Sequence, residues 1–215
     1  MSRRSTLLAA VGLLAIATAC TPEAPTTTVA AEGDGRAAAE VVEELIRAVT
    51  TGDYAAAAAF TITEQMAWVV MAEGGSLAQA GSLSDDDLTE VAVNYWKGFA
   101  ETAQLPSIEV GVAQESEISG VRFAVVPVNA NLRLVMRDDG GWRVDIIASF
   151  APSLANRLIE AAEVVEANRG GQGGGLREIL SDQRPSVEIA ARQPGLAEAT
   201  RTELADLLEV LADLE

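Results

Sequence analysis

The chain has 215 residues, of which 32 are Asp or Glu and 15 are Lys or Arg, so its formal net charge is −17. It contains no histidine and one cysteine, which excludes Ser-His-Asp and Cys-His catalysis, histidine metal ligands, an internal disulfide and cysteine metal clusters. The acidic balance argues against nucleic-acid binding, because phosphate backbones are contacted by Lys and Arg, and a hydrophobic share of 49% indicates a packed globular protein.

The amino-terminal residues have the pattern of an export signal. Arg3 and Arg4 open it, and an apolar run of eleven residues follows from Leu7 to Ala17. This length fits the hydrophobic region of a signal peptide and is too short for a membrane span. We therefore expect residues 1–19 to be a signal peptide, used by the general secretory route or, given the paired arginines, by the twin-arginine route.

The residues directly before the cysteine resemble a known processing motif. Ala17, Thr18 and Ala19 are small and stand between the apolar run and Cys20, which resembles the lipobox of bacterial lipoproteins. The resemblance implies a diacylglycerol on Cys20, further acylation by a fatty acid such as palmitate, and attachment to the outer face of the cytoplasmic membrane. Two acyl chains hold a protein on a bilayer durably. The alternative is an ordinary signal peptide cleaved elsewhere, which would leave a spectator cysteine.

A tether is expected between this anchor and the folded part. Residues 20–35 are rich in Thr and Pro and lack a periodic apolar face. Such a composition stiffens a chain without giving it a core. Because an acidic protein is repelled by an anionic membrane surface, we expect the folded part to stand off from the bilayer.

Helical periodicity dominates residues 36–106. An apolar stripe predicts a first helix that ends near Gly52, and Asp53 is a candidate N-cap for a short Ala-rich helix. Thr61 predicts a capping box that opens a third helix, and Ser84 with three following Asp residues predicts a fourth. We assign the acidic run to helix capping, because it lacks the alternating spacing of a calcium loop.

The periodicity changes to two after Pro106. Alternating apolar positions predict strands over residues 108–112 and between Val121 and Met136. The run Asp138–Gly141 predicts a hairpin loop, and a last strand is expected to continue through Ile146. Three or four antiparallel strands, with the N-terminal helices packed on one face, predict an α+β fold.

Further helices are expected after the sheet. One is predicted over residues 153–168, and the glycine-rich residues 169–175 predict a flexible linker. Residues 176–215 then read as a separate helical tail. We therefore expect residues 36–168 to fold without the tail, and the leucine face of the tail to pack on this body or on a partner. This face consists of Leu204, Leu207, Leu211 and Leu214.

The order of these patterns is similar to that of the NTF2-like superfamily. The similarity rests on a helix ending near Gly52, an Ala-rich helix after Tyr54, and a strand meander in which Trp142 follows a glycine turn. It covers about residues 36–150 and implies an NTF2-like domain over residues 36–168. In that fold a curved sheet wraps a long helix and leaves a conical pocket. Members include enzymes, binding domains and scaffolds, so the fold alone does not decide function.

Four residues are candidates for lining such a pocket. They are Tyr54 and Tyr95, Trp96, and Asp145, which is expected on the strand face opposite Trp142. An Asp beside a Tyr in an apolar pocket could transfer protons, because burial raises the pKa of the carboxyl, and the NTF2-like resemblance implies isomerases or dehydratases that work in this way. The tryptophans are more typical of a core than of a stacking platform, because they lie among periodic apolar residues.

These observations predict a binding or scaffold lipoprotein without catalytic activity. Histidine, the commonest group for acid–base work near neutral pH, is missing, and the acid clusters lie where caps and turns need them. We expect no catalytic residue, metal site or cofactor, a membrane contact through the lipid on Cys20, and a protein or envelope partner. Two alternatives stay open, which are a carrier or sensor of an apolar small molecule and an NTF2-like isomerase or dehydratase.

Overall fold

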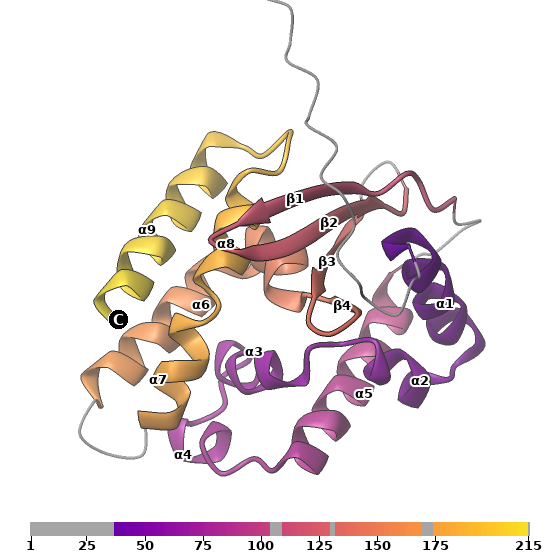
Figure 1. Cartoon of the computed structure of the whole chain (residues 1–215). Helices are drawn as coiled ribbons and strands as arrows, with labels where there is room; N and C mark the ends of the chain where they lie inside the picture. The colour runs from indigo at the N-terminus through magenta and orange to yellow at the C-terminus, as the bar shows by residue number, and fades with distance from the viewer. Residues whose placement is uncertain (1–36, 104–108, 130–131, 169–173, 215) are drawn as a thin grey trace, which may run out of the picture.

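Helices precede and follow a single sheet along the chain. The structure, a computed structural model, describes residues 37–103, 109–129, 132–168 and 174–214. Before the sheet lie α1 (Ala38–Thr51), α2 (Tyr54–Ala59), the 3₁₀ helix η1 (Thr63–Gln65), α3 (Met66–Ala72), α4 (Leu77–Ala80) and α5 (Asp85–Thr102). The sheet contains β1 (Gln114–Ile118), β2 (Val121–Pro127), β3 (Arg133–Asp138) and β4 (Trp142–Val144), and after it come α6 (Ile146–Ala167), α7 (Gly174–Ser181), α8 (Arg184–Ala191) and α9 (Glu198–Leu214) (Figure 1).

Three boundaries of the early helices coincide with capping residues in the sequence. α1 ends at Gly52, whose φ of 78° is left-handed and suits a residue without a Cβ. The Asp53 carboxylate accepts a hydrogen bond from the Ala56 amide at 3.1 Å and caps α2. Ser84 and Asp87 form a reciprocal capping box at the start of α5. These three predicted boundaries are confirmed. The capping box predicted at Thr61 is wrong, because Thr61 Oγ1 donates to the Ala57 carbonyl at 3.2 Å and neither η1 nor α3 begins with a side-chain cap.

The sheet is an antiparallel meander in the strand order β1-β2-β3-β4, so the α+β class is confirmed. Ser119 and Gly120 turn the chain between β1 and β2 with φ values of 54° and 79°. Pro127 ends β2 opposite Arg133, where the lack of an N–H group is tolerated. The extended stretch predicted from Val121 onward is therefore two strands.

The first strand lies later than the alternation predicts. Residues 109–113 form no strand, residue 108 lies outside the described residues, and β1 covers Gln114–Ile118. All of β1 except Ile118 is exposed. Since β1 is an edge strand of the sheet, no core imposes an alternating pattern on it.

The chain also leaves the sheet earlier than predicted. β4 ends at Val144, and Ile146 begins α6 instead of continuing the strand. The Asp145 carboxylate accepts a hydrogen bond from the Ala148 amide at 2.7 Å and caps the new helix. The prediction that this helix starts at Ser153 is therefore wrong.

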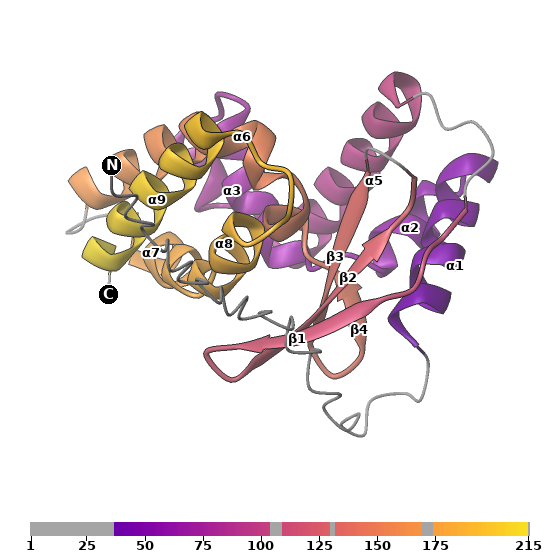
Figure 2. The ribbon, with the colours of Figure 1, turned by 90° about the horizontal axis from the view of Figure 1, so that it is seen from above.

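Helices cover both faces of the sheet, which corrects the expectation of helices on one face (Figure 2). On one face, Ala124 and Met136 belong to the same core as α1. On the other face, Phe123 contacts a small cluster that includes Ala148 of α6 and Ile189 of α8. The second face is thus covered by helices that follow the sheet in the chain.

α6 is the central helix of the second half of the molecule. It packs on α3, α8 and α9 and touches α7 and β3. One hydrophobic core extends from α1 to α9, and the four leucines of the predicted face, Leu204, Leu207, Leu211 and Leu214, are at most 2% exposed. The prediction that this leucine face packs on the body is confirmed. The independent folding of residues 36–168 stays a prediction, although the shared core argues against it.

The predicted anchoring segments lie outside the described residues. This applies to the signal peptide (1–19), to Cys20 with the lipobox, and to the tether (20–35). Most of the predicted linker, residues 169–173, also lies outside them, whereas Gly174 and Gly175 belong to α7. In the ranges that the structure describes, no helix is both long and apolar enough to cross a bilayer.

Candidate functional site

Asp145 is fully buried at the start of α6, with 0% of its surface exposed. Its Oδ1 accepts hydrogen bonds from the Ala148 amide and from Gln65 Nε2 at 2.8 Å, and its Oδ2 accepts one from Ser186 Oγ at 2.5 Å. Neither tyrosine is among its hydrogen-bonding partners in the described residues. The structure therefore does not bring together the Asp–Tyr pair that a proton-transfer site would need.

Gln65 connects this carboxyl to the helices after the sheet. Its Nε2 donates both to Asp145 and, at 2.7 Å, to Gln183 Oε1, while its Oε1 accepts from the Ile146 amide at 2.8 Å. Every polar atom of the Gln65 side chain is therefore used. Together with Ser186, these side chains join η1, the start of α6 and the α7–α8 region in one buried polar network.

Burial raises the pKa of the Asp145 carboxyl, because desolvation disfavours its charged form. Hydrogen bonds from Ala148, Ser186 and Gln65, and the charge of Arg137, oppose this rise. The groups that touch the carboxyl are neutral donors that are fixed by the fold. We therefore assign this network a structural role, in which it joins η1, the start of α6 and the α7–α8 region.

A second buried contact joins the end of α8 to α6. Pro152 lies inside α6 and has no N–H group, so it cannot donate to the Ala148 carbonyl one turn earlier. Gln193 Nε2 donates to that carbonyl at 2.9 Å instead. A side chain that follows α8 thereby satisfies the group that the proline leaves free.

A groove of about 810 Å³ lies between α3, α4 and α5. Its walls combine aliphatic and aromatic surface with a few polar side chains, and three glycines border it. The described lining residues are Val69, Val70, Glu73, Gly74, Gly75, Gln79, Val91, Asn94, Tyr95, Gly98, Phe99 and Thr102.

Aromatic side chains form the α5 side of this groove. Tyr95 packs edge-to-face on Trp96 at 5.5 Å and on Phe150 at 5.9 Å, and Phe99 packs on Trp96 at 5.4 Å between ring centroids. Trp96 is fully buried, and its Nε1 donates to Thr61 Oγ1 at 2.8 Å. Trp96 is therefore a core residue behind the groove, while Tyr95 and Phe99 line it.

The Tyr95 hydroxyl stays protonated at physiological pH. Burial and the nearby Glu73 carboxylate raise the pKa of this phenol above its ordinary value. Glu73 itself is exposed and is the one charged residue among the described lining residues. The groove therefore offers a neutral phenol and a carboxylate, but no basic side chain from the described part of the chain.

Gly98 leaves open space on the α5 side of the groove, because it has no side chain. A Cβ at this exposed position would meet nothing within 4 Å, although glycine inside a helix costs about 1 kcal/mol relative to alanine. A Cβ at Gly75, by contrast, would lie 2.6 Å from Val70 Cγ1. The first glycine is thus free to accept a side chain, and the second is required by packing.

One of the four predicted pocket residues lines the groove, and that residue is Tyr95. Tyr54 is the first residue of α2 and is packed against the core, Trp96 lies behind the groove wall, and Asp145 is in the buried network. Glu73 and Gly98 were missed by the sequence analysis. The signal for Gly98 was a glycine within an otherwise strong helical pattern, which the periodicity alone does not mark as a site.

A smaller hollow, of about 510 Å³, lies where the β1–β2 turn and β3 meet the α7–α8 region. Arg137, Arg184, Asp182 and Glu188 line it, and Arg184 forms an ion pair with Glu188 at 3.4 Å. Its charges are balanced, so it offers no clear preference for a ligand of either sign.

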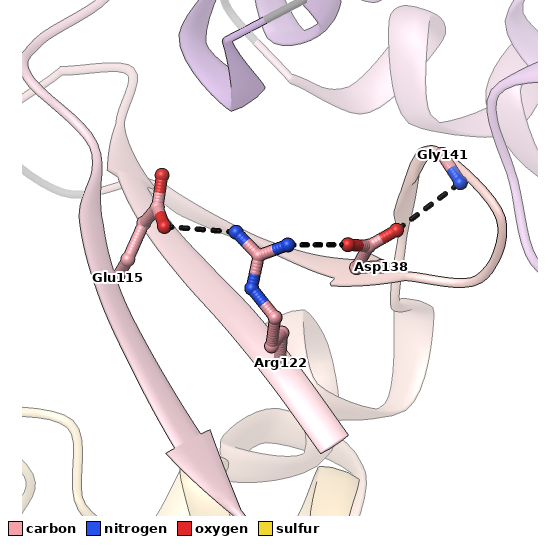
Figure 3. A network of polar contacts seen from close by, with 4 residues as sticks. All are labelled: Glu115, Arg122, Asp138 and Gly141. Atoms are coloured by element: carbon pink, nitrogen blue, oxygen red, sulfur yellow. Dashed lines mark hydrogen bonds and ion pairs between the residues drawn. The ribbon is translucent and has the colours of Figure 1, made fainter. Parts of the chain in front are cut away.

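Arg122 links the strands on the α1 side of the sheet (Figure 3). Its guanidinium forms ion pairs with Asp138 at 2.7 Å and with Glu115 at 3.1 Å, and it lies 5.2 Å from the centroid of the Trp142 ring. Asp138 also accepts a hydrogen bond from the Gly141 amide at 3.1 Å. These contacts stabilise the hairpin, so Asp138 has a structural role.

Within the described ranges, no group of three or more Cys, Asp or Glu side chains is placed to hold a metal ion. No family model, curated protein or solved structure matches the chain. The similarity to the NTF2-like superfamily stays a prediction from sequence.

Proposed function

We propose that this chain is an exported, lipid-anchored binding protein without catalytic activity, and that the α3–α5 groove is its binding site. The observation behind this proposal is the groove itself. Its volume of about 810 Å³ lies within the range of sites for small molecules, and its lining combines apolar surface with several polar side chains. Among the functions considered from sequence, this favours a carrier or sensor of a small, largely apolar molecule over a module that binds only a protein partner.

The absence of catalysis is proposed from the titratable groups near the site. Tyr95 is held protonated in the groove, and Glu73 is exposed to solvent. Asp145, the candidate base, is occupied by Gln65 and Ser186. An isomerase or dehydratase would need an acid–base pair held within hydrogen-bonding reach of a substrate, and no hydrogen bond in the described part of the chain positions the exposed Glu73 carboxylate for this role.

Anchoring is proposed from the sequence before residue 37. The apolar run and the small residues before Cys20 support a lipid on this cysteine and a location at the outer face of the cytoplasmic membrane. Replacement of Cys20 by Ala should release the protein from the membrane fraction and stop incorporation of labelled palmitate. Retention of the variant on the membrane, as for the parent, would contradict the anchor.

A relation to the NTF2-like superfamily is part of the proposal. The antiparallel meander with α1 on one of its faces supports it. The helices on the second face are an addition to the pattern of that superfamily, and we propose that residues 176–215 were added to an NTF2-like body as a helical extension.

Gly98 provides the test of the groove. We expect Gly98→Phe to fill it and to weaken binding of the neutral fluorescent probe N-phenylnaphthylamine by about tenfold or more, because the new ring takes the place of the ligand. Gly98→Ala is the matched control, since it adds one methyl group to open space, and it should leave binding within about twofold. The measurement is a fluorescence titration of the full chain with Cys20→Ser.

Equal probe binding by Gly98→Phe and the parent would overturn the assignment of the groove. A circular-dichroism melt of both variants checks that the fold is intact. Gly98→Ala should also melt at a higher temperature than the parent, because alanine favours the helix by about 1 kcal/mol.

A further inference from the structure

The charge distribution of the groove is one-sided. Glu73 is the one charged group among the described lining residues, and no ion-pair partner for it is found in the described part of the chain. It stands at the C-cap of α3, where the helix dipole disfavours an anion and favours a cation. The placement of Glu73 therefore does not help the local helix and leaves a negative charge beside the groove.

The neighbouring lining groups are suited to a cation with an apolar body. Tyr95 and Phe99 present aromatic rings, which attract cations through their negative faces. The oxygens of Tyr95 and Asn94 can accept hydrogen bonds from an ammonium group. Val69 and Val91 supply apolar surface along the same groove.

The whole molecule adds to this local field. Its formal net charge is −17, and Asp85, Asp86 and Asp87 lie in the first turn of α5, the helix that forms one wall of the groove. A strongly negative molecule raises the local concentration of cations and repels anions. An anionic ligand would have to approach against this field and bind beside the Glu73 carboxylate.

We infer that the α3–α5 groove selects organic cations, in which an ammonium group is bound between Glu73 and the aromatic residues and an apolar body fills the rest of the groove. This inference rests on the proposed function, because it requires the groove to be a binding site. It adds the class of ligand, which is an amine with an aromatic or aliphatic body. Neutral molecules of the same shape bind more weakly, and carboxylates bind weakest.

Three probes that differ only in their end group test this selection. Naphthylethylamine is a cation, naphthylethanol is neutral and naphthylacetate is an anion. Each is titrated into the ¹⁵N-labelled full chain carrying Cys20→Ser at low salt, and binding is followed by the amide signals of Gly74, Gly75 and Gly98, which border the groove. We expect the amine to bind about fivefold tighter than the alcohol, and this ratio to fall as salt is added.

Two variants assign the preference to its residue. In Glu73→Gln, the affinity for the amine should fall until the affinities for the amine and the alcohol agree to within about twofold. Glu101→Gln is the matched control, because Glu101 is an exposed acid of α5 that does not line the groove. It should retain the preference for the amine.

The outcomes separate the two proposals. Equal affinity for amine and alcohol in the parent, or a preference that survives Glu73→Gln, would overturn the selection of cations and leave the groove as a binding site. If none of the three probes shifts the glycine signals, both the binding site and its ligand class are wrong.

Discussion

At the scale of single residues, Asp145 is a carboxyl that is fully buried. Its carboxyl accepts hydrogen bonds from Gln65, Ser186 and Ala148, all of which are neutral donors. Removal of the carboxyl would leave these buried donors without a partner, whereas an amide of the same shape could replace it. The two kinds of substitution are therefore expected to have different effects.

We expect Asp145→Ala to destabilise the protein by about 2–4 kcal/mol, because it leaves buried donors unsatisfied. Asp145→Asn keeps one acceptor oxygen for Gln65 and Ala148 and offers an N–H to the hydroxyl of Ser186, so it should be much less harmful. Urea denaturation of the variants measures the free energy of unfolding. A comparable loss in both variants would contradict the assigned hydrogen bonds.

The same residue predicts a pH dependence of stability. The unfolded carboxyl titrates near its ordinary pKa of 3.8, and burial raises the pKa in the folded protein. A raised folded pKa favours folding below the unfolded pKa, and this contribution is lost as the pH rises through the folded pKa. The stability of the parent relative to Asp145→Asn should therefore fall as the pH rises from about 4.

Asp139→Asn is the control for this pH series, because Asp139 is an exposed residue of the β3–β4 turn. The free energy of unfolding of the parent relative to Asp139→Asn should not fall as the pH rises. A parent that gains stability relative to Asp145→Asn as the pH rises would show that the carboxyl is stabilised as an anion, contrary to the direction given by burial.

At the scale of elements, α6 is held at its start by residues from three other segments. Gln65 of η1 caps its first turn, Val144 of β4 leads into it, and Gln193 binds the Ala148 carbonyl that Pro152 leaves without a helical donor. A proline inside a helix is tolerated here because a distant side chain supplies the missing hydrogen bond.

This compensation predicts a coupling between Gln193 and Pro152. Gln193→Ala should destabilise the parent by about 1–2 kcal/mol, because the Ala148 carbonyl is left buried and unpaired. In a Pro152→Ala background, residue 152 regains an N–H group that can bond this carbonyl, so the same substitution should cost less. A double-mutant cycle of unfolding free energies measures the coupling, and strictly additive effects would contradict it.

At the scale of the whole molecule, the helices after the sheet complete the core. Leu176, Leu180 and the leucines of α9 belong to the same hydrophobic cluster as α1 and α3. Ser186 and Gln183 add polar contacts to η1 and α6. Such contacts make a single cooperative unfolding unit more consistent with the structure than a body with an attached tail.

We expect the protein to unfold in a single transition. Leu211→Ala should lower the free energy of unfolding by about 2–5 kcal/mol, because it leaves a cavity at a fully buried site. Leu208→Ala on the same helix is a milder control, since Leu208 is half-buried. Differential scanning calorimetry makes the measurement. A separate low-temperature transition for α9, with the main transition unchanged, would instead support independent folding of residues 36–168.

The candidate site contains one residue that was predicted from the sequence and others that the sequence pattern did not indicate. Tyr95 was identified as a pocket residue because it is one of two tyrosines in the chain, but the pocket was expected against the sheet. The groove lies instead between α3 and α5, and which faces of two helices meet depends on packing rather than on local pattern. The contribution of Glu73 and Gly98 is visible only once these helices are placed beside each other.

Interactions within a few residues were determined by the sequence itself. The cap at Ser84, the turn at Gly120, the hairpin before Trp142 and the leucine face of α9 follow from local hydrogen bonding and from the spacing of apolar residues. The exclusion of histidine and cysteine chemistry follows from composition in the same way.

Only the tertiary structure decided that the chain bends into α6 at Asp145 and that Gln65 meets Gln183. These residues are far apart in the chain, 80 positions for Gln65 and Asp145 and 118 for Gln65 and Gln183. The alternation of Val144 and Ile146 fits both a strand and the start of a helix. Asp145 supplies a local N-cap through the Ala148 amide, and the distant donors Gln65 and Ser186 satisfy the rest of its buried carboxyl, which the periodicity could not show.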